Sequence, residues 1–204
     1  VSAASEMVHH LYQQGARSFL ILGSTHTRAT SSAGALRQRG IEKALTELGL
    51  DSWAWRSVEV SPWTAEGAET ALGQWLESNT LPDAIFTMND LLGAGALRAL
   101  SRAQVRVPQD VLVSSWDDTV LSRFSTPALT TISPDTHAIA HEAVAGLIAL
   151  IEGNGRTGES RGAAETDADA DEALNPAHSN QPSTQVSDVT VSYTLTVRES
   201  TKRV

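Results

Sequence analysis

The stretch PDAIFTMNDLLGAGALRALSRA, residues 82–103, decides the fold. Its part AIFTM (84–88) is a short apolar run that is typical of a buried strand, and the part at 91–103 is rich in Ala, Leu and Gly and has the length of a helix. A buried strand that leads directly into a helix is half of a βαβ unit, in which the next strand runs parallel to the first. We therefore expect an α/β protein built on a parallel sheet.

The same alternation of strands and helices continues along the rest of the chain. Apolar residues at helical spacing predict helices that end at Gly15, Gly49 and Gly153. The predicted strands are 18–23, 56–60, 84–88, 111–115 and 129–132, and the predicted helices after the first are 36–48, 68–76, 91–103 and 137–153. Because connections between parallel strands are right-handed, we expect helices on both faces of the sheet.

The segment 154–189 breaks this pattern. It holds seven acidic and two basic side chains, and most of its other residues are small or polar. Such a segment buries too little apolar surface to offset the entropy of ordering it, so we expect a disordered acidic insertion. The following VTVSYTLTVRES (189–200) alternates with period two, which predicts one further strand within a final segment 190–204.

Composition excludes several classes of protein. The chain has 204 residues, of which 41% are hydrophobic, enough for one globular domain or at most two small ones. A net charge of −9 predicts poor binding to nucleic acid by these residues alone, and the lack of cysteine excludes disulfides and cysteine-bound zinc. The sequence shows neither a secretory signal nor an apolar stretch long enough to span a bilayer, so we expect a soluble, cytoplasmic protein with no membrane partner.

Polar and aromatic side chains follow the predicted strands, where an open parallel sheet binds its ligands. Trp63 follows the second strand, Asn89 the third, and Trp116 and Asp117 the fourth, while Arg37 lies on the helix after the first. Planar polar groups pair with adjacent hydroxyls, and an indole covers the apolar face of a sugar ring. This set therefore favours a sugar as ligand.

Each of these residues also has a purely structural interpretation. Asn and Asp after a strand are common N-caps of the next helix, and for Asp90 capping is the better interpretation. Trp63 and Trp116 could equally be core aromatics. From periodicity alone, the protein is an α/β domain with a polar rim.

Six segments in register resemble the LacI/GalR family of bacterial transcription regulators. They are GARSFLILG (15–23), ALRQRGIEKAL (35–45), PDAIFTMNDLLGAGALRAL (82–100), VPQDVLVSSWDD (107–118), PALTTISPD (127–135) and TLTVREST (194–201). Each segment is a weak signal alone, but together they are spread in register over nearly the whole chain, except 154–189. The resemblance implies a sensor fold like that of the periplasmic sugar-binding proteins, which has two lobes.

The resemblance also implies how the chain is divided. Residues 1–132 would form the C-terminal lobe, 133–153 a hinge and a helix that returns to the other lobe, and 190–204 a last strand and tail. The rest of the other lobe and a helix-turn-helix domain would lie upstream of Val1. DNA would be a partner only through that upstream domain.

The resemblance assigns roles to individual residues. Arg37 resembles the arginine that binds ligand hydroxyls or a base edge, Asn89 and Asp117 resemble the pair that orients the ligand, and Trp63 an aromatic contact of sugar-responsive members. Ser115 departs from the family's usual glycine, and Thr136 stands where some members have an aromatic contact. The candidate ligand-binding residues are Arg37, Trp63, Asn89, Trp116, Asp117 and Asp135. The candidate contacts of a homodimer are Leu91, Leu92 and Leu121, although all three could equally belong to the core.

Other motifs in the chain do not support a catalytic or metal site. The frame GNGRTGES (153–160) has Glu159 where a phosphate loop needs lysine, and the acidic run near Asp169 lacks the glycine and glutamate of a calcium loop. His137 and His141 share a helix face without an evident third ligand. We expect no enzyme activity, no metal and no cofactor.

The sequence thus predicts the effector-sensing domain of a DNA-binding repressor. A small molecule, expected to be a sugar, would bind between the two lobes and alter the affinity of a dimer for its operator. The alternative is a solute-binding protein of a sugar transporter, which shares the two-lobed fold.

Overall fold

The computed structural model describes residues 1–24, 33–50, 53–158 and 190–203. Six strands form one sheet in the order β2-β1-β3-β4-β5-β6. The strands are β1 (Phe19–Leu22), β2 (Trp55–Val58), β3 (Ala84–Thr87), β4 (Leu112–Trp116), β5 (Thr130–Pro134) and β6 (Tyr193–Thr196). All neighbours are parallel except β6, which runs antiparallel to β5. The predicted α/β class with a mostly parallel sheet is confirmed.

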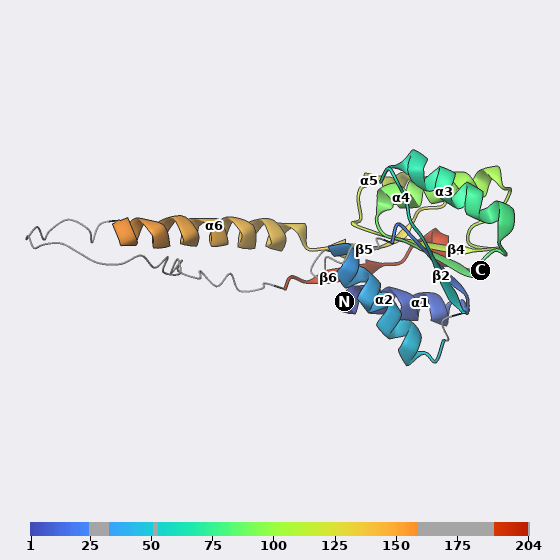
Figure 1. Ribbon diagram of the computed structural model, residues 1–204, viewed down its shortest axis with the longest axis horizontal. Coiled ribbons are helices and arrows are strands. Elements are labelled where there is room, and N and C mark those ends of the chain that lie inside the picture. The colour runs from blue at the N-terminus through green and yellow to red at the C-terminus, as the bar shows by residue number, and fades with distance from the viewer. Residues whose placement is uncertain (25–32, 51–52, 159–189, 204) are drawn as a thin grey trace, which may run out of the picture. The chain divides into compact units, whose positions relative to one another are not determined.

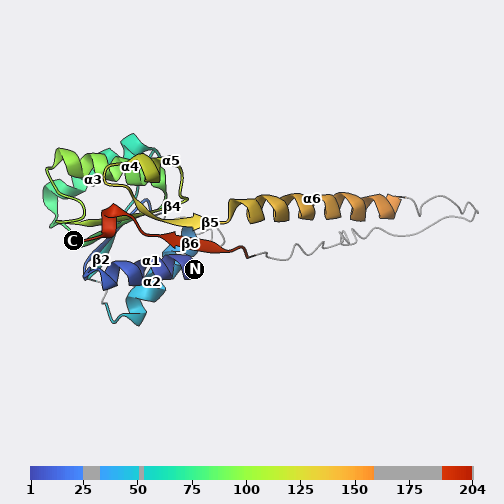
Figure 2. The same cartoon turned by 180° about the vertical axis from the view of Figure 1, so that it is seen from behind.

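Helices cover both faces of this sheet (Figure 1), and Figure 2 shows the same arrangement from behind. The helices are α1 (Ser2–Gln13), α2 (Ala33–Glu47), α3 (Ala65–Ser78), α4 (Asp90–Arg102), α5 (Val120–Phe124), α6 (Thr136–Gly158) and the 3-10 helix η1 (Glu199–Thr201). The helices α1 and α2 pack together on one face, and α3 and α4 pack together on the other. Helices on both faces explain why every residue of β1 and β3 is buried, rather than every second residue.

The core lies between these layers. Every residue of β1 and of β3 is buried, whereas the edge strand β2 is only partly buried. The largest fully buried side chains of the core include Phe86, Met7 and Leu11. Leu36, the first residue of the predicted helix 36–48, is 36% exposed beside Arg37.

A carboxylate fixes the starts of two neighbouring strands. Oδ2 of Asp83 accepts hydrogen bonds from the backbone N–H groups of Arg17 and Ser18, each at 2.9 Å. Burial raises the pKa of Asp83, but these hydrogen bonds outweigh burial and leave the pKa below its ordinary value. The ionised carboxylate therefore ties β1 to β3 at the amino ends of the strands.

The chain divides into two compact units, Val1–Pro134 with Tyr193–Val204, and Asp135–Ser192. In the second unit, α6 continues to Gly158, past the Gly153 at which the sequence pattern predicts its end. One helical glycine costs only about 1 kcal/mol, which does not end a helix whose hydrogen bonds continue. The remaining residues of the predicted insertion, 159–189, lie outside the described residues. Within the described part of the chain, no helix is both long enough and apolar enough to cross a membrane.

The last strand is shorter than the predicted run 189–200. It ends at Thr196, and the chain then turns into η1. The hydroxyl of Ser200 accepts a hydrogen bond from the N–H of Thr130 at 2.8 Å and donates to the carbonyl of Val113 at 2.5 Å. These side-chain hydrogen bonds replace the strand ladder at the end of the chain, which alternation alone could not indicate.

A glycine permits the close contact between α3 and α4. A β-carbon added to Gly95 on α4 would lie 2.1 Å from the backbone oxygen of Ala65 on α3. Gly73 on α3 is also inside a helix, but a β-carbon there would meet nothing within 4 Å. The two glycines therefore separate the effect of packing from the effect of helix propensity.

We predict that alanine at these two positions changes stability in opposite directions. Gly95→Ala should lower the free energy of unfolding by about 1–3 kcal/mol, because the added methyl group overlaps backbone atoms. Gly73→Ala should raise it by roughly 0.5–1 kcal/mol, because alanine favours the helix. Urea unfolding measures both, and equal effects at the two positions would contradict the close contact.

Candidate functional site

The chain reverses its direction of travel across the sheet between β1 and β3. From β1 it moves outward to β2, and from β2 it returns to the other side of β1 to form β3. At such a switch point, open α/β sheets bind their ligands in a crevice at the carboxyl ends of the strands. The helices α2 and α4 follow these two strands, so they bring Arg37 and Asn89 to this crevice.

Arg37 is held in place from three sides. One terminal nitrogen, Nη1, donates to the carbonyl of Met88, and Nη2 lies 3.3 Å from Oδ1 of Asp117. The guanidinium carbon lies 4.4 Å from the ring centroid of Trp116. The side chain of Arg37 is only 17% exposed. Burial lowers the pKa of Arg37, and the charge of Asp117 opposes that change.

Trp116 supports this arginine. Its ring packs on Phe86 of β3, with the centroids 6.5 Å apart, and it also packs against the guanidinium of Arg37. A cation over an indole gains roughly 0.5–2 kcal/mol, depending on desolvation. The structure therefore gives Trp116 a position beneath Arg37, whereas direct contact with a ligand stays a prediction.

The two aspartates after β4 point to different partners. Asp117 has φ 104° and Asp118 has φ 51°, so both lie in the left-handed region that non-glycine residues rarely adopt. Such a backbone conformation costs of order 1–3 kcal/mol per residue and persists only where its surroundings hold it. Asp117 pairs with Arg37, and Asp118 pairs with Arg198 at 2.6 Å.

Asn89 is the N-cap of α4. Its side-chain oxygen accepts a hydrogen bond from the N–H of Leu92 at 2.9 Å. Within the described residues, its amide nitrogen has no protein partner and is available as a donor. Asn89 can therefore cap the helix and contact a ligand at the same time, so the two interpretations of the sequence are compatible.

Trp63 lies beside the end of β1 and is 42% exposed. A β-carbon added to Gly23 would lie 3.2 Å from the indole nitrogen of Trp63 and 2.3 Å from Leu92. Gly23 has φ 94°, which also favours glycine. The exposed indole is therefore near the switch point, whereas the residues 25–32 that follow β1 are outside the described part.

Asp90 has a role that the sequence did not reveal. It is buried, and its carboxylate accepts hydrogen bonds from the hydroxyl of Ser115, from the N–H of Thr119 at 2.6 Å and from the hydroxyl of Thr131 at 3.0 Å. The cap of α4 is Asn89, so the capping role expected for Asp90 is wrong. Ser115, where the family resemblance expects glycine, supplies one of these donors, and this departure was the only signal for the network in the sequence.

Asp135 belongs to the second unit. One carboxylate oxygen accepts from the N–H of Ala138 at 2.9 Å, and the other accepts from the hydroxyl of Ser192 at 3.1 Å. Both oxygens therefore have structural partners at the start of α6. A contact between Asp135 and a ligand stays a prediction, and so does the position of Thr136 in any binding site.

The candidate metal and phosphate motifs gain no support within the described residues. His137 and His141 lie on α6, where His141 is near Glu142, and no group of three possible metal ligands occurs in the described part of the chain. The backbone of 153–158 is helical, whereas a phosphate loop is a turn that follows a strand. The acidic run near Asp169 lies outside the described residues.

The three candidate dimer contacts differ in exposure. Leu91 and Leu121 are each 39% exposed, whereas Leu92 is fully buried. Leu92 lies against Gly23 inside the core, so the structure does not support it as a dimer contact. Leu91 and Leu121 remain candidates.

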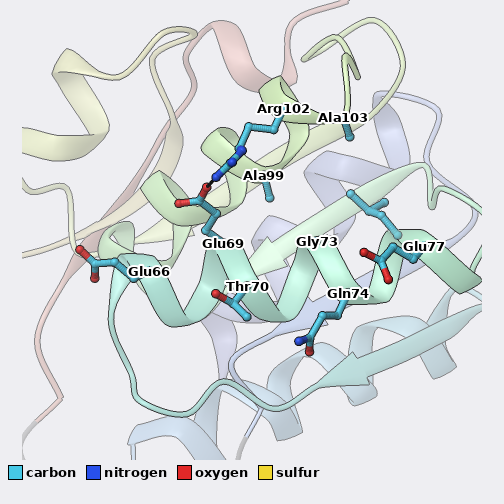
Figure 3. Close-up of a pocket in the computed structure, with 10 residues that line it drawn as sticks. Glu66, Glu69, Thr70, Gly73, Gln74, Glu77, Ala99, Arg102 and Ala103 are labelled. Carbon is cyan, nitrogen blue, oxygen red and sulfur yellow. Dashed lines mark hydrogen bonds and ion pairs between the residues drawn. The ribbon is translucent and has the colours of Figure 1, made fainter.

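A separate hollow lies on the outer surface of α3 and α4 (Figure 3). Its volume is about 580 Å³, and Glu69 pairs there with Arg98 at 2.9 Å and with Arg102 at 2.7 Å. Figure 3 shows that Thr70 and Gln74 line it from α3. None of the predicted ligand-binding residues lines this hollow, so a substitution in the hollow can serve as a control for substitutions in the crevice.

The neighbouring aspartates have opposite pKa shifts. Burial raises the pKa of Asp117, Arg37 opposes this, and the net direction is upward. Burial also raises the pKa of Asp118, but hydrogen bonds from Arg198 and Ser122 and the charge of Arg198 outweigh burial, so the net direction is downward. Ionised Asp117 therefore costs stability, and ionised Asp118 contributes stability.

We predict opposite effects of the two amides at pH 7. Asp117→Asn should increase the free energy of unfolding, and Asp118→Asn should decrease it. The Asp117 difference should decline as the pH falls through its raised folded pKa. The Asp118 difference should be complete above the ordinary aspartate pKa of 3.8 and decline as the pH falls from there toward its lowered folded pKa. Urea unfolding between pH 7 and pH 3 measures both differences. A less stable Asp117→Asn protein at pH 7 would show that pairing with Arg37 outweighs burial.

Comparisons with known proteins agree with this architecture. Residues 8–166 match the model of the periplasmic binding protein-like domain. The chain is 30% identical over 142 residues to the transcriptional repressor PurR of Pasteurella multocida (strain Pm70), covering 66% of this chain and 39% of the relative. It is 32% identical over 135 residues to the ribose operon repressor of Escherichia coli (strain K12), covering 63% of this chain and 41% of the relative. The chain thus spans about two fifths of the length of these relatives.

Solved structures give the same result. A protein described as a LacI-family transcriptional regulator from Sanguibacter keddieii DSM 10542 is 33% identical, with a TM-score of 0.72, over 98% of this chain and 65% of that one. A LacI-family regulator from Arthrobacter sp. FB24, in complex with lactose, is 26% identical, with a TM-score of 0.71, over 98% of this chain and 62% of that one. The predicted resemblance is confirmed: the chain belongs to the LacI/GalR family and carries its periplasmic-binding-protein-like effector-binding domain.

Proposed function

We propose that the crevice at the carboxyl ends of the strands binds a small polar effector, and that this effector is a sugar. The position of Arg37 carries the proposal. Three partners hold its guanidinium before any ligand arrives, namely the Met88 carbonyl, Asp117 and the ring of Trp116. A donor whose orientation is fixed in advance loses less entropy on binding, which raises affinity.

The remaining groups of the crevice suit a polyhydroxylated ring. Arg37 and the amide of Asn89 offer donors, the second oxygen of Asp117 offers an acceptor, and Trp63 offers an exposed aromatic face. Paired donors and acceptors match adjacent hydroxyls, and an aromatic face matches the C–H face of a sugar. A relative named for the ribose operon and a neighbour in complex with lactose support the same class of ligand.

The full-length protein would be a cytoplasmic repressor that binds its operator as a homodimer. The relatives are transcriptional repressors, which supports regulation rather than catalysis. Ligand binding would favour one arrangement of the two lobes and thereby change the affinity for DNA. DNA contact would come from a domain outside this acidic chain.

An apolar patch offers a surface for the second copy. It consists of Leu91, Val120, Leu121 and Phe124, and Phe124 is 81% exposed. Leu91 lies near the start of α5, because its neighbour Asp90 is bonded to Thr119. Exposed apolar side chains of this kind on adjacent elements mark interaction surfaces, and a two-fold dimer would use the patch of both copies.

A solute-binding protein for a sugar transporter is the second candidate function. It would use the same crevice, because the periplasmic binding protein-like domain matched by this chain is common to both classes. The two functions differ in DNA binding and in the upstream sequence. The family of this chain favours the repressor.

We predict that substitutions in the crevice weaken sugar binding. Arg37→Met should weaken binding about 10- to 100-fold, because hydrogen bonds to a charged group are worth about 1.5–3 kcal/mol. Asn89→Asp keeps an oxygen for the helix cap but removes the amide donor, so it should weaken binding about 2- to 10-fold. Calorimetry of the full-length protein measures these changes in affinity, with D-ribose, lactose and adenine as the probes.

Arg102→Met is the matched control for this experiment. It removes an arginine from the hollow of Figure 3 and leaves the crevice unchanged, so binding should keep its affinity. Weaker binding in the control but not in Arg37→Met would move the ligand site to α3 and α4. Binding of adenine but of neither sugar would support the crevice as the binding site and contradict a sugar as its ligand.

We also predict that the full-length gene product retards specific genomic DNA fragments in a gel, and that the bound sugar changes this retardation. Phe124→Asp should weaken DNA binding at least about tenfold, because a charge in an apolar interface disfavours the dimer. Leu81→Asp, at another partly exposed apolar position, is the control. A full-length protein without sequence-specific DNA binding would support the transporter alternative.

A further inference from the structure

The turn that carries Asp117 is held from its other side by the end of the chain. Nη2 of Arg198 lies 2.6 Å from Oδ1 of Asp118, the residue next to Asp117. Nη1 of the same arginine donates to the hydroxyl of Ser122 at 3.2 Å and to the carbonyl of Leu129 at 2.9 Å. One side chain thus joins the turn, α5 and the start of β5.

Arg198 is itself fixed. Its side chain is 17% exposed, and its backbone N–H donates to the hydroxyl of Thr130 at 2.8 Å. The residues after it are also bonded, because the N–H of Ser200 donates to the carbonyl of Ala128 at 3.0 Å and the hydroxyl of Thr201 lies 2.7 Å from that of Thr130. The guanidinium therefore acts as a fixed point for the turn.

The turn needs such a fixed point. Both of its aspartates have φ in the left-handed region, at 104° and 51°, and the surroundings must maintain that conformation. The N–H of Asp117 donates to the carbonyl of Ile132 at 2.9 Å, whereas the N–H of Asp118 donates to the hydroxyl of Thr131 over 3.4 Å. The carboxylate of Asp118 also accepts a hydrogen bond from the hydroxyl of Ser122 at 3.1 Å. At 2.6 Å, the ion pair with Arg198 is the shortest of these contacts on the Asp118 side of the turn.

We propose that Arg198 is a positioning residue for the effector site. It acts through Asp118 on the turn, and the turn places the carboxylate of Asp117 and the ring of Trp116 against Arg37. This role rests on the proposed function of the crevice, but the positioning itself does not require a ligand. Because Ser122 of α5 shares the contact, the same residue links the crevice to the apolar patch on α5.

NMR of the 204-residue chain tests the proposal without a ligand. The probes are the ¹⁵N–¹H signals of the Trp116 indole and of Nε of Arg37, which are assigned with Trp116→Phe and Arg37→Lys. Arg198→Met removes the cation but keeps an aliphatic stem, and it should shift both signals. Asp118→Asn removes the partner's charge and suits a left-handed backbone, and it should shift the same two signals. Arg198→Lys should restore part of the parent position.

Arg106→Met is the matched control. It breaks an ion pair of the same length, 2.6 Å between Arg106 and Asp110, in a turn that does not contact the crevice. It should leave both signals in place. Thermal unfolding is measured in parallel. If Arg198 contributes only to stability, its loss would lower the melting temperature without shifting the signals of Trp116 or Arg37.

The proposal is overturned if both signals keep the parent position in Arg198→Met and Asp118→Asn. If Arg198→Met does not fold, the two signals of Asp118→Asn decide whether the proposal holds. If neither variant folds, the two signals of Arg198→Lys decide it. Shifted signals together with an absence of sugar binding would leave the positioning role intact and count against the proposed function alone. Sugar binding together with unshifted signals would support the proposed function and count against the positioning role of Arg198.

Discussion

The buried carboxylate of Asp90 joins four elements at the carboxyl ends of the strands. From the first turn of α4, it accepts hydrogen bonds from β4, from the residue before α5 and from β5. A buried polar group is costly unless hydrogen bonds satisfy it, so the burial of Asp90 depends on the donors that these elements supply. The position of Asn89, the turn after β4 and the start of α5 all depend on that condition.

The turn after β4 joins this scaffold to the candidate ligand site. Its two aspartates serve different purposes, because Asp117 meets Arg37 of the crevice and Asp118 meets Arg198 of the last segment. Both the raised pKa of Asp117 and the left-handed backbone of the turn disfavour stability. Groups held at such a cost are typical of sites that bind ligands.

The same short region also connects the surfaces that a regulator would have to couple. Trp116 and Asp117 face the crevice through Arg37, and the exposed Phe124 lies only a few residues further along the chain. A change in the turn on ligand binding would therefore reach α5 through Ser122 and the adjoining backbone. Coupling of two sites needs a contiguous structural element of this kind that both sites can bias.

The strand-end rule predicted from sequence part of the cluster that forms the candidate site. It placed Arg37, Asn89, Trp116 and Asp117 at one edge of the sheet because parallel strands end there, and the structure brings Arg37, Trp116 and Asp117 into contact. It did not find the roles of Asp90 and Arg198, because their partners come from other elements. It also did not separate Leu91 from Leu92, since adjacent residues at the start of a helix differ in burial only once the helix is docked.

The sequence by itself determined the α/β class, the order of most elements and the edge of the sheet that carries the polar side chains. Periodicity and the position of turn residues are local properties, so they can be read without the fold. Only the tertiary structure decided which groups pair, such as Arg37 with Asp117 and Arg198 with Asp118, both 80 residues apart. Those pairs depend on strand order, register and backbone conformation at single residues, which are set when distant segments pack together.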